Sequence, residues 1–256
     1  MGGLLSLMVY QVLAGDAQVE EFKKTGIEGE IIVCREALVD GPIDAETLDE
    51  FWGQRARFIL AEYGDDEIEY HEKVADPLNQ LTELTPDDEV NLWFEYELFC
   101  SVNMWFCLSL VEPTGAAVYR VEPIGLEVAN RWDGFAKFTA DDLKAAFELR
   151  TRFTAEEMEL GATLWNAYRR KNYAELRSAA QGEWPCFPYL AEVVAAAAEQ
   201  DIRPLEVVRE IQAGGEADFG EIFKEFRQRA GVYGYGDVQV RRLLDQSSSG
   251  SSSSSI

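Results

Sequence analysis

The sequence predicts an α/β protein with a Rossmann-like, mostly parallel sheet in its N-terminal half, followed by a mainly helical C-terminal region. In the first half, short apolar runs rich in β-branched residues alternate with longer amphipathic segments, which is typical of parallel sheets. Beyond residue 125, capping boxes and helical spacing replace that pattern. We therefore divide the chain into an α/β domain (1–125), a helical region (126–200), a small module (201–246) and a Ser-rich tail (247–256).

Four segments have the composition of buried strands. Residues 8–14 end at Gly15 and Asp16, and residues 30–35 end at the turn sequence VDGPI. Residues 90–97 and 116–121 are expected to form the third and fourth strands. With helices between them, these segments predict one sheet with helices on both faces.

The segments between these strands show helical spacing. A crossover helix is expected from a cap at Asp44 to a stop at Gly64, and a strongly acidic helix follows that should break near Pro77. The third strand should lead into a helix that begins near Ser101.

The second half is expected to be helical. Thr139 with Asp142, and Thr154 with Glu157, form capping boxes that open two long helical patterns, the second reaching residue 180. Another helix is expected over 187–200. From residue 204, three short helices predict a helical or winged-helix-like module, in which GVYGYGD forms a turn and a helix start capped by Asp237. The Ser-rich tail cannot bury a core and is expected to be disordered.

The charge balance excludes some partners. A formal charge of −24 opposes non-specific binding to nucleic acid or to anionic lipid. The segment 203–245 has seven basic and eight acidic residues, far from the basic surface of nucleic-acid-binding modules. We therefore expect this module to contact a protein partner or to pack on the rest of the chain.

The cysteines and apolar runs indicate a cytoplasmic protein without a membrane span. The four cysteines form no CxxC pair, so reduced thiols are expected. The opening segment is apolar but has no Lys or Arg before its apolar run, which disfavours export. The run 98–111 is too short to cross a bilayer.

Several familiar chemistries lack their residues. The single histidine, His71, lies in EIEYHEK, where a solvated acidic helix face is expected, so a site with several histidine ligands is impossible. The sequence has no GxGxxG, GxxxxGK[ST] or GxSxG motif.

Polar residues follow the predicted strands instead, where ligands bind in open parallel sheets. They are Asp16, Arg35, Asp40, Glu95, Glu97, Ser101 and Asn103. If the third strand reaches residue 97, the side chains of Glu95 and Glu97 point to the same side.

These residues predict a site with two kinds of group. Asp16, Glu95 and Glu97 are the candidate catalytic carboxylates, which would bind Mg²⁺ or divide acid and base roles. Arg35 and Asp40, with Ser101 and Asn103 at a helix start, are the candidate ligand-binding residues. The alternative is that Glu95 and Glu97 are half-buried partners of Arg35 and Arg55 that hold loops in place.

The same stretches resemble a known bacterial family. The segments GDAQ, GEIIVCREALVDGPI, FWGQRARFI and LWFEYELFCSVNMW, which lie in order between residues 8 and 112, are together similar to the family catalogued as domain of unknown function 1835, and YGYGDVQVRRLL is similar to the end of its longer members. The family motif Trp-Phe-Glu-His-Asp has Tyr96 and Glu97 here in place of its last two residues. The resemblance therefore implies which positions form the site. It implies neither a histidine-based mechanism nor a particular activity.

Two functions follow as hypotheses. The first is an α/β domain that binds or acts on a small phosphorylated or nucleotide-like ligand at the carboxyl ends of the strands. The second is a regulatory or interaction protein that senses a ligand without catalysis and contacts a protein partner through its C-terminal module.

Overall fold

A computed structural model describes residues 7–64, 66–215 and 218–251. Its sheet has the strand order β2-β1-β3-β4-β5. The first four strands are parallel, and the short β5 pairs antiparallel with β4. The mostly parallel α/β class predicted from the sequence is confirmed, with β5 as an unpredicted addition. The strands are β1 (Val9–Leu13), β2 (Glu30–Val33), β3 (Glu89–Trp93), β4 (Ala117–Val121) and β5 (Thr151–Arg152).

Both faces of the sheet are buried, which explains the nearly continuous apolar character of its strands. Val12 is in register with Leu92, and these two side chains belong to the larger core. The next residues along, Leu13 and Trp93, belong to a smaller core on the opposite face. The alternation of side chains along each strand thus divides the apolar residues between two cores.

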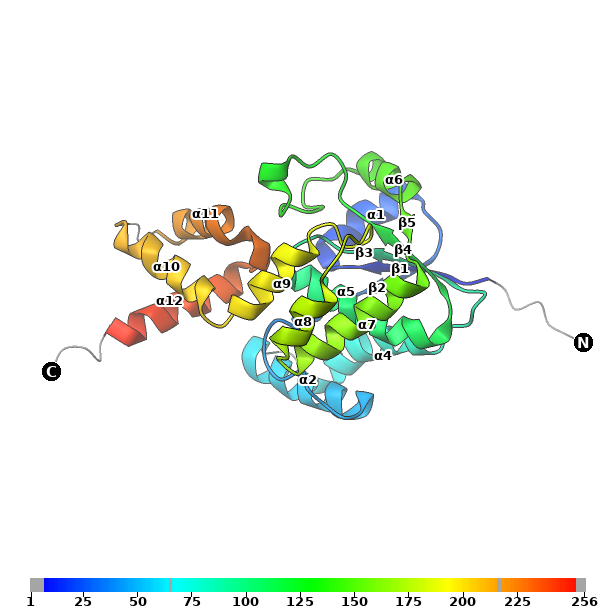
Figure 1. Ribbon diagram of the computed structural model, residues 1–256, viewed down its shortest axis with the longest axis horizontal. Coiled ribbons are helices and arrows are strands. Elements are labelled where there is room, and N and C mark those ends of the chain that lie inside the picture. The colour runs from blue at the N-terminus through cyan, green and yellow to red at the C-terminus, as the bar shows by residue number, and fades with distance from the viewer. Residues whose placement is uncertain (1–6, 65, 216–217, 252–256) are drawn as a thin grey trace, which may run out of the picture.

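Helices cover the two faces unequally, as Figure 1 shows. Helices α1 and α6 cover the face with the smaller core, while α2, α4 and α5 cover the other, and α7 packs outside α5. The helices of this part are α1 (Val19–Thr25), α2 (Leu48–Tyr63), α3 (Glu67–Tyr70), α4 (Asp76–Asn79), α5 (Leu98–Val111), α6 (Ala140–Glu148) and α7 (Ala155–Arg169).

Helix α5 is buried on nearly every side because it lies between the sheet and α7. Its sequence accordingly lacks a polar face. Gly161 of α7 allows the close approach, since a β-carbon there would collide with Leu108 of α5. No helix in the described part of the chain is long and apolar enough to cross a bilayer.

Three boundaries in the first half differ from the sequence prediction. The third strand ends at Trp93, so Glu95 lies in a loop. The helix expected near Ser101 already begins at Leu98, because the Glu97 side chain accepts hydrogen bonds from the Cys100 N–H and caps it. Thr47, rather than Asp44, caps α2, which ends at Gly64 as predicted.

The acidic helix continues through Pro77 instead of breaking there. A π-helical turn over His71–Ala75 joins α3 to α4. Pro77 has no N–H to donate, and the carbonyl oxygen of Lys73, four residues earlier, accepts a hydrogen bond from Arg35 at 2.7 Å. His71 is exposed, as expected.

The second half is helical as predicted, with three corrections. Both capping boxes are present, but the long pattern after Thr154 forms two helices, separated near Lys171, whose φ is 53°. The described part of the C-terminal module has no strand, so it is not winged. Its last helix reaches Ser251, where disorder was expected, while residues 252–256 and 1–6 lie outside the described residues. These helices are α8 (Tyr173–Ala179), α9 (Leu190–Glu199), α10 (Arg203–Ala213), α11 (Phe219–Ala230) and α12 (Asp237–Ser251).

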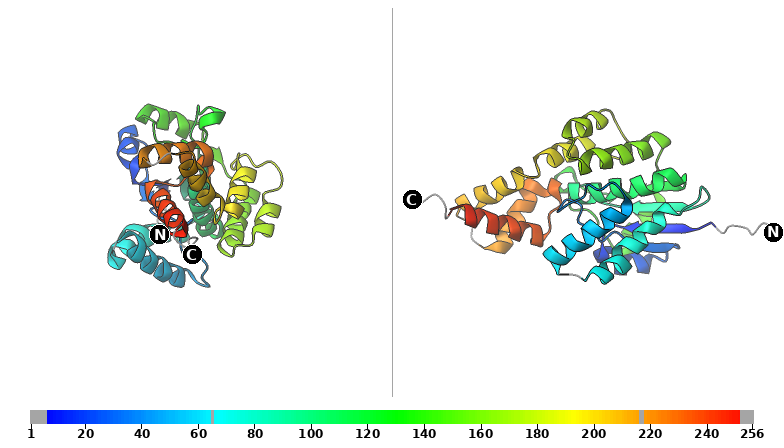
Figure 2. Two further views of the ribbon diagram at one scale, coloured as in Figure 1. Left: turned by 90° about the vertical axis from the view of Figure 1, so that its left-hand side faces the viewer. Right: turned by 90° about the horizontal axis from the view of Figure 1, so that it is seen from below.

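Helices α10, α11 and α12 lie beyond the carboxyl ends of the strands, at the end of the molecule opposite the described N-terminal residues (Figures 1 and 2). A cluster of hydrogen bonds around Asp40 holds α12 against the α/β part. The Asp40 carboxylate accepts hydrogen bonds from Tyr63 at 2.8 Å and from Gln239 and Arg242 at 3.3 Å each. The C-terminal helices are therefore packed onto the edge of the sheet where a ligand site was expected.

Candidate functional site

A pocket of about 240 Å³ lies between the end of β3 and the C-terminal helices. We call it the inner pocket. Glu95 and Glu97 line it from the loop after β3, and the remaining walls come from the segment before α6, from α11 and from the connection between α11 and α12. Its lining residues are Glu95, Glu97, Trp132, Asp133, Ala136, Phe223, Phe226, Arg227, Ala230, Gly231, Gly234, Tyr235 and Gly236.

Glu97 is held by the helix that it caps. Both of its carboxylate oxygens accept from the Cys100 N–H, at 3.2 and 3.0 Å. The side chain is only 4% exposed. Burial, followed by the nearby charge of Glu95, raises the pKa of Glu97 to about 8. Near neutral pH, this carboxyl group is therefore mostly protonated.

Glu95 has a different environment a few ångströms away. Its Oε1 accepts from the Phe135 N–H at 2.7 Å, and its own carbonyl oxygen accepts from the buried Arg120 at 3.1 Å. Burial raises the pKa of Glu95, but the Phe135 N–H and the positive charge of Arg227 oppose this rise. Both neighbouring carboxyl groups thus have raised pKa values, and of the two only Glu95 has a nearby guanidinium group that opposes the rise.

Two glycines with left-handed backbone leave room for the two carboxylates. Gly134 has φ 61° and Gly234 has φ 67°. A β-carbon at Gly134 would collide with the carboxyl group of Glu95, and one at Gly234 would collide with that of Glu97. Both the backbone conformation and the close approach require glycine at these positions.

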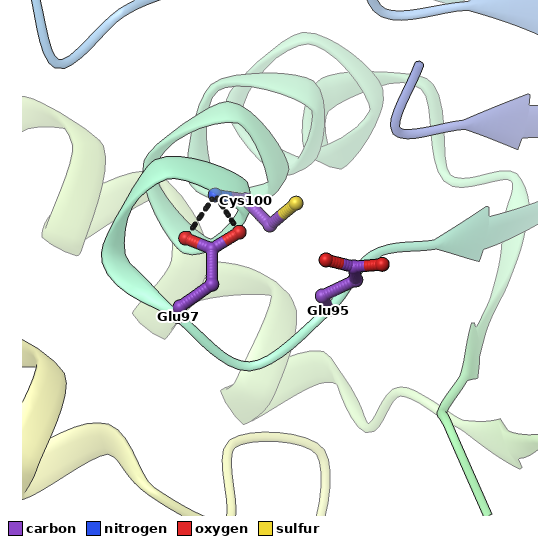
Figure 3. A group of neighbouring side chains, drawn as sticks. All are labelled: Glu95, Glu97 and Cys100. Atoms are coloured by element: carbon purple, nitrogen blue, oxygen red, sulfur yellow. Dashed lines mark hydrogen bonds between the residues drawn. The ribbon is translucent and has the colours of Figure 1, made fainter. Parts of the chain in front are cut away.

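The thiol of Cys100 completes a group of three potential metal ligands (Figure 3). Ligand atoms of Glu95, Glu97 and Cys100 all lie within 4.8 Å of one another. Mg²⁺ prefers oxygen ligands and water, whereas a thiolate suits Zn²⁺. Burial raises the pKa of Cys100 well above its ordinary value, which disfavours the thiolate. The donor set therefore suits neither ion well.

A second hollow of about 420 Å³ lies next to the inner pocket and shares Trp132, Asp133, Phe223 and Arg227 with it. We call it the outer hollow. Its charged lining residues are three basic side chains, Lys137, Lys224 and Arg227, and one acidic side chain, Asp133. Charge therefore changes sign along the cleft, from carboxyl groups inside to cations outside.

The other predicted site residues do not line either pocket. Asp16 and Arg35 form a two-pronged ion pair, with both N···O distances at 2.8 Å. Asp40 fastens α12, as described above. The Ser101 hydroxyl donates to the carbonyl oxygen of Tyr96 at 3.0 Å, and the Asn103 amide donates to that of Glu36 at 2.8 Å.

The structure also bears on the alternative that Glu95 and Glu97 are partners of Arg35 and Arg55 that hold loops in place. Arg35 pairs with Asp16, and the fully buried Arg55 pairs with Glu36 at 2.7 Å, where Tyr70 also donates to Glu36. Neither arginine contacts Glu95 or Glu97 through an ion pair in the described chain. The two arginines expected to pair with Glu95 and Glu97 thus pair with Asp16 and Glu36 instead.

Sequence reasoning missed the residues that reach the site from far along the chain. Trp132, Gly134, Arg227 and Gly234 meet Glu95 and Glu97 only after folding. The glycines in WDGF and GVYGYGD are the sequence signal that could have indicated that these two segments approach the site. The second of these stretches does form the predicted turn, and the turn contacts the site as well.

No family model, curated protein or solved structure matches the chain in the comparisons. The resemblance to the family of domain of unknown function 1835 therefore stays a prediction.

Proposed function

We propose that the protein binds a small phosphorylated, nucleotide-like molecule across the inner pocket and the outer hollow. The observation that carries this proposal is the change of charge along one aromatic-lined cleft. A ligand with a nitrogen-rich ring at one end and a phosphate at the other complements both parts. The two volumes together fall in the range of roughly 300–1,000 Å³ that small-molecule sites occupy.

The position of the cleft supports the same proposal. In the strand order β2-β1-β3-β4-β5, the chain moves outward from β1 to β2 and from β3 to β4, so the order reverses between β1 and β3. Ligands of open α/β sheets bind beyond the carboxyl ends of the strands at such a reversal. The inner pocket begins at Glu95, two residues past the end of β3.

The proposed ligand belongs to the class expected from the sequence. Its phosphate would contact residues other than those predicted from the sequence. Arg227 at the shared wall, with Lys137 and Lys224 farther out, would contact the phosphate. Arg227 Nη2 lies 3.2 Å from Asp133 Oδ1, and both residues line the inner pocket and the outer hollow. Lys137 also pairs with Asp133, and Lys224 pairs with Glu221, so a bound phosphate would compete with these acidic residues for the three cations.

Calorimetric titration of the full chain tests this function. Adenosine, guanosine, cytidine and uridine monophosphates would be compared with their nucleosides and with inorganic phosphate at one ionic strength. We expect at least one monophosphate to bind more tightly than its nucleoside and than phosphate. Arg227→Gln should weaken that binding roughly tenfold, the effect of losing about 1.4 kcal/mol, while leaving the nucleoside unaffected.

Arg209→Gln is the matched control, because Arg209 is an exposed arginine of α10 that lines neither pocket. It should bind like the unchanged protein. Failure of all four monophosphates to bind, or equal binding by the Arg227→Gln and unchanged proteins, would contradict the proposal.

A second function, ligand sensing without catalysis, is favoured by one specific observation. The inner pocket has walls from both the α/β part and the C-terminal helices, so a bound ligand would stabilise their contact. If this function holds, the bound monophosphate should slow amide hydrogen exchange in α10 and α12, which lie outside the direct ligand contacts. Unchanged exchange in these helices would reject the sensing function.

A further inference from the structure

A small cavity lies next to the loop that carries Glu95, between β4, α5 and the start of α9. We call it the Arg120 cavity. Arg120 of β4 and Trp105 of α5 line it, together with Cys186 and with Val193 of α9. Its volume is about 10 Å³, and a cavity needs roughly 10–15 Å³ to admit one water molecule. The Arg120 cavity therefore has the size of a single water site.

The guanidinium group of Arg120 is buried with few acceptors around it. Arg120 is only 2% exposed. Its Nη2 donates to the carbonyl oxygen of Glu95 at 3.1 Å, and its Nη1 contacts the sulfur of Met104, which is a weak acceptor. Its Nε has no hydrogen-bond partner among the described residues. Because a buried polar group without a partner is destabilising, this N–H requires a further acceptor.

The neighbouring carboxylate of Glu122 does not bond that N–H directly. Glu122 Oε1 lies 3.7 Å from Arg120 Nε, which makes an ion pair that is longer than a hydrogen bond. This oxygen is also buried and has no hydrogen-bond partner in the described chain. Glu122 lies close to the cavity, since its charge and that of Arg120 both act on the Cys186 thiol that lines it. Polar contacts longer than 3.5 Å are commonly bridged by water.

A second donor without a partner lines the same cavity. Trp105 is fully buried, and its indole Nε1 has no hydrogen-bond partner within the described residues. Buried tryptophan N–H groups usually have one. Trp93, which is buried to the same extent, donates to Gln11 at 2.8 Å. Two donors and one acceptor that lack partners thus come together at one cavity.

Charge and size favour water over an ion as the occupant. Arg120 and Glu122 already carry opposite charges, so an added anion would leave an excess of negative charge in a buried place. An added cation would instead face the guanidinium group. Water adds no charge, is smaller than chloride, and can make up to four hydrogen bonds with buried polar groups.

We infer that the Arg120 cavity binds one internal water molecule, which accepts hydrogen bonds from Trp105 Nε1 and Arg120 Nε and donates one to Glu122 Oε1. This water is a fixed part of the folded protein. It holds Arg120 in the position from which Nη2 donates to the Glu95 carbonyl oxygen, at the edge of the inner pocket. The inference is independent of which ligand the inner pocket binds.

Magnetisation transfer from water to the tryptophan indole N–H groups tests the inference in solution. In the full chain labelled with ¹⁵N, the signals of Trp105 and Trp93 are those that Trp105→Phe and Trp93→Phe lack. We expect the Trp105 indole to show nuclear Overhauser effects with water of opposite sign in the laboratory and rotating frames, which distinguishes bound water from hydrogen exchange. The Trp93 indole, bonded to Gln11, is the control and should show none. No such effect at Trp105 would overturn the inference.

A crystal structure of the unchanged full chain, soaked in sodium bromide, decides even if these variants do not fold. We expect one density peak roughly 2.7–3.2 Å from both Trp105 Nε1 and Arg120 Nε, without the anomalous signal of bromide. A bromide signal at this place would overturn the inference in favour of an anion. A dry cavity in which Arg120 Nε donates directly to Glu122 would overturn it as well.

Filling the cavity separates a water site from an empty void. Val193 lines the cavity, whereas its neighbour Val194 is equally buried and does not line it. The extra methylene of Val193→Ile would displace the water and leave its three partners unpaired. We expect its thermal midpoint to fall by about 2–4 °C more than that of the control Val194→Ile. A higher midpoint for Val193→Ile than for the unchanged protein would contradict the inference, because filling a dry cavity stabilises a protein.

Discussion

At the scale of single residues, Gly234 sets the shape of the inner pocket beside Glu97. Gly234 approaches the Glu97 carboxyl group so closely that no side chain fits, and its φ of 67° is one that other residues adopt only at a cost. Gly26 at the end of α1 has nearly the same φ, 69°, but a β-carbon there would meet nothing within 4 Å. The two positions therefore separate backbone strain from collision.

We expect Gly26→Ala to lower the free energy of unfolding by about 1–2 kcal/mol, the cost of left-handed backbone in a residue with a side chain. Gly234→Ala should cost about 1–3 kcal/mol more, because Glu97 must also move away. Urea denaturation of the two variants measures this difference. Equal losses would mean that Gly234 does not hold Glu97 in place.

The protonation of Glu97 has a consequence for stability. Its pKa is raised from 4.5 to about 8, so between these values the folded protein keeps a proton that the unfolded chain has lost. Stability must then fall as pH rises through this interval, by at most about 1.4 kcal/mol per pH unit. Relative to Glu97→Gln, the unchanged protein should lose unfolding free energy from pH 5 to 8. Parallel curves for the two proteins would contradict this assignment.

At the scale of elements, the strands and most helices could be predicted because their signals are local. Runs of β-branched residues marked β1 to β4, and capping boxes marked α6 and α7. The start of α5 was missed because glutamate is not among the preferred N-cap residues, so the apolar pattern appeared to continue as a strand through Glu97. The contacts of Glu95 and Glu97 with Gly134 and Gly234 join distant segments, and no local pattern indicates them.

Asp40 holds α12 against the α/β part through hydrogen bonds, and a substitution can test this role. Burial, and then the charge of Asp40, raise the pKa of Tyr63 to about 12, so this hydroxyl stays a donor to Asp40 throughout the neutral range. Asp40→Ala should speed amide hydrogen exchange in α12 and weaken ligand binding at the inner pocket. Asp44→Ala, which removes a surface ion pair with Arg169, is the control and should leave α12 unchanged. Equal exchange in the two variants would show that Asp40 does not hold α12.

At the scale of the whole molecule, the C-terminal helices close the edge of the sheet instead of forming a separate module. The site expected from the sequence included Asp16 and Arg35 near the ends of β1 and β2, but these two residues pair with each other. The pocket lies beyond β3, with walls from parts of the chain more than a hundred residues apart. This shared construction is the central claim, because the proposed ligand site depends on it.

Amide hydrogen exchange of the full chain, with and without the tightest-binding nucleoside monophosphate, tests this claim most directly. We predict that the ligand slows exchange together in three separate segments: 94–100 after β3, 132–136 before α6, and 227–236 between α11 and α12. Slowed exchange confined to the segments around Asp16 and Arg35, or to the C-terminal helices alone, would contradict a site built jointly from the sheet edge and these helices.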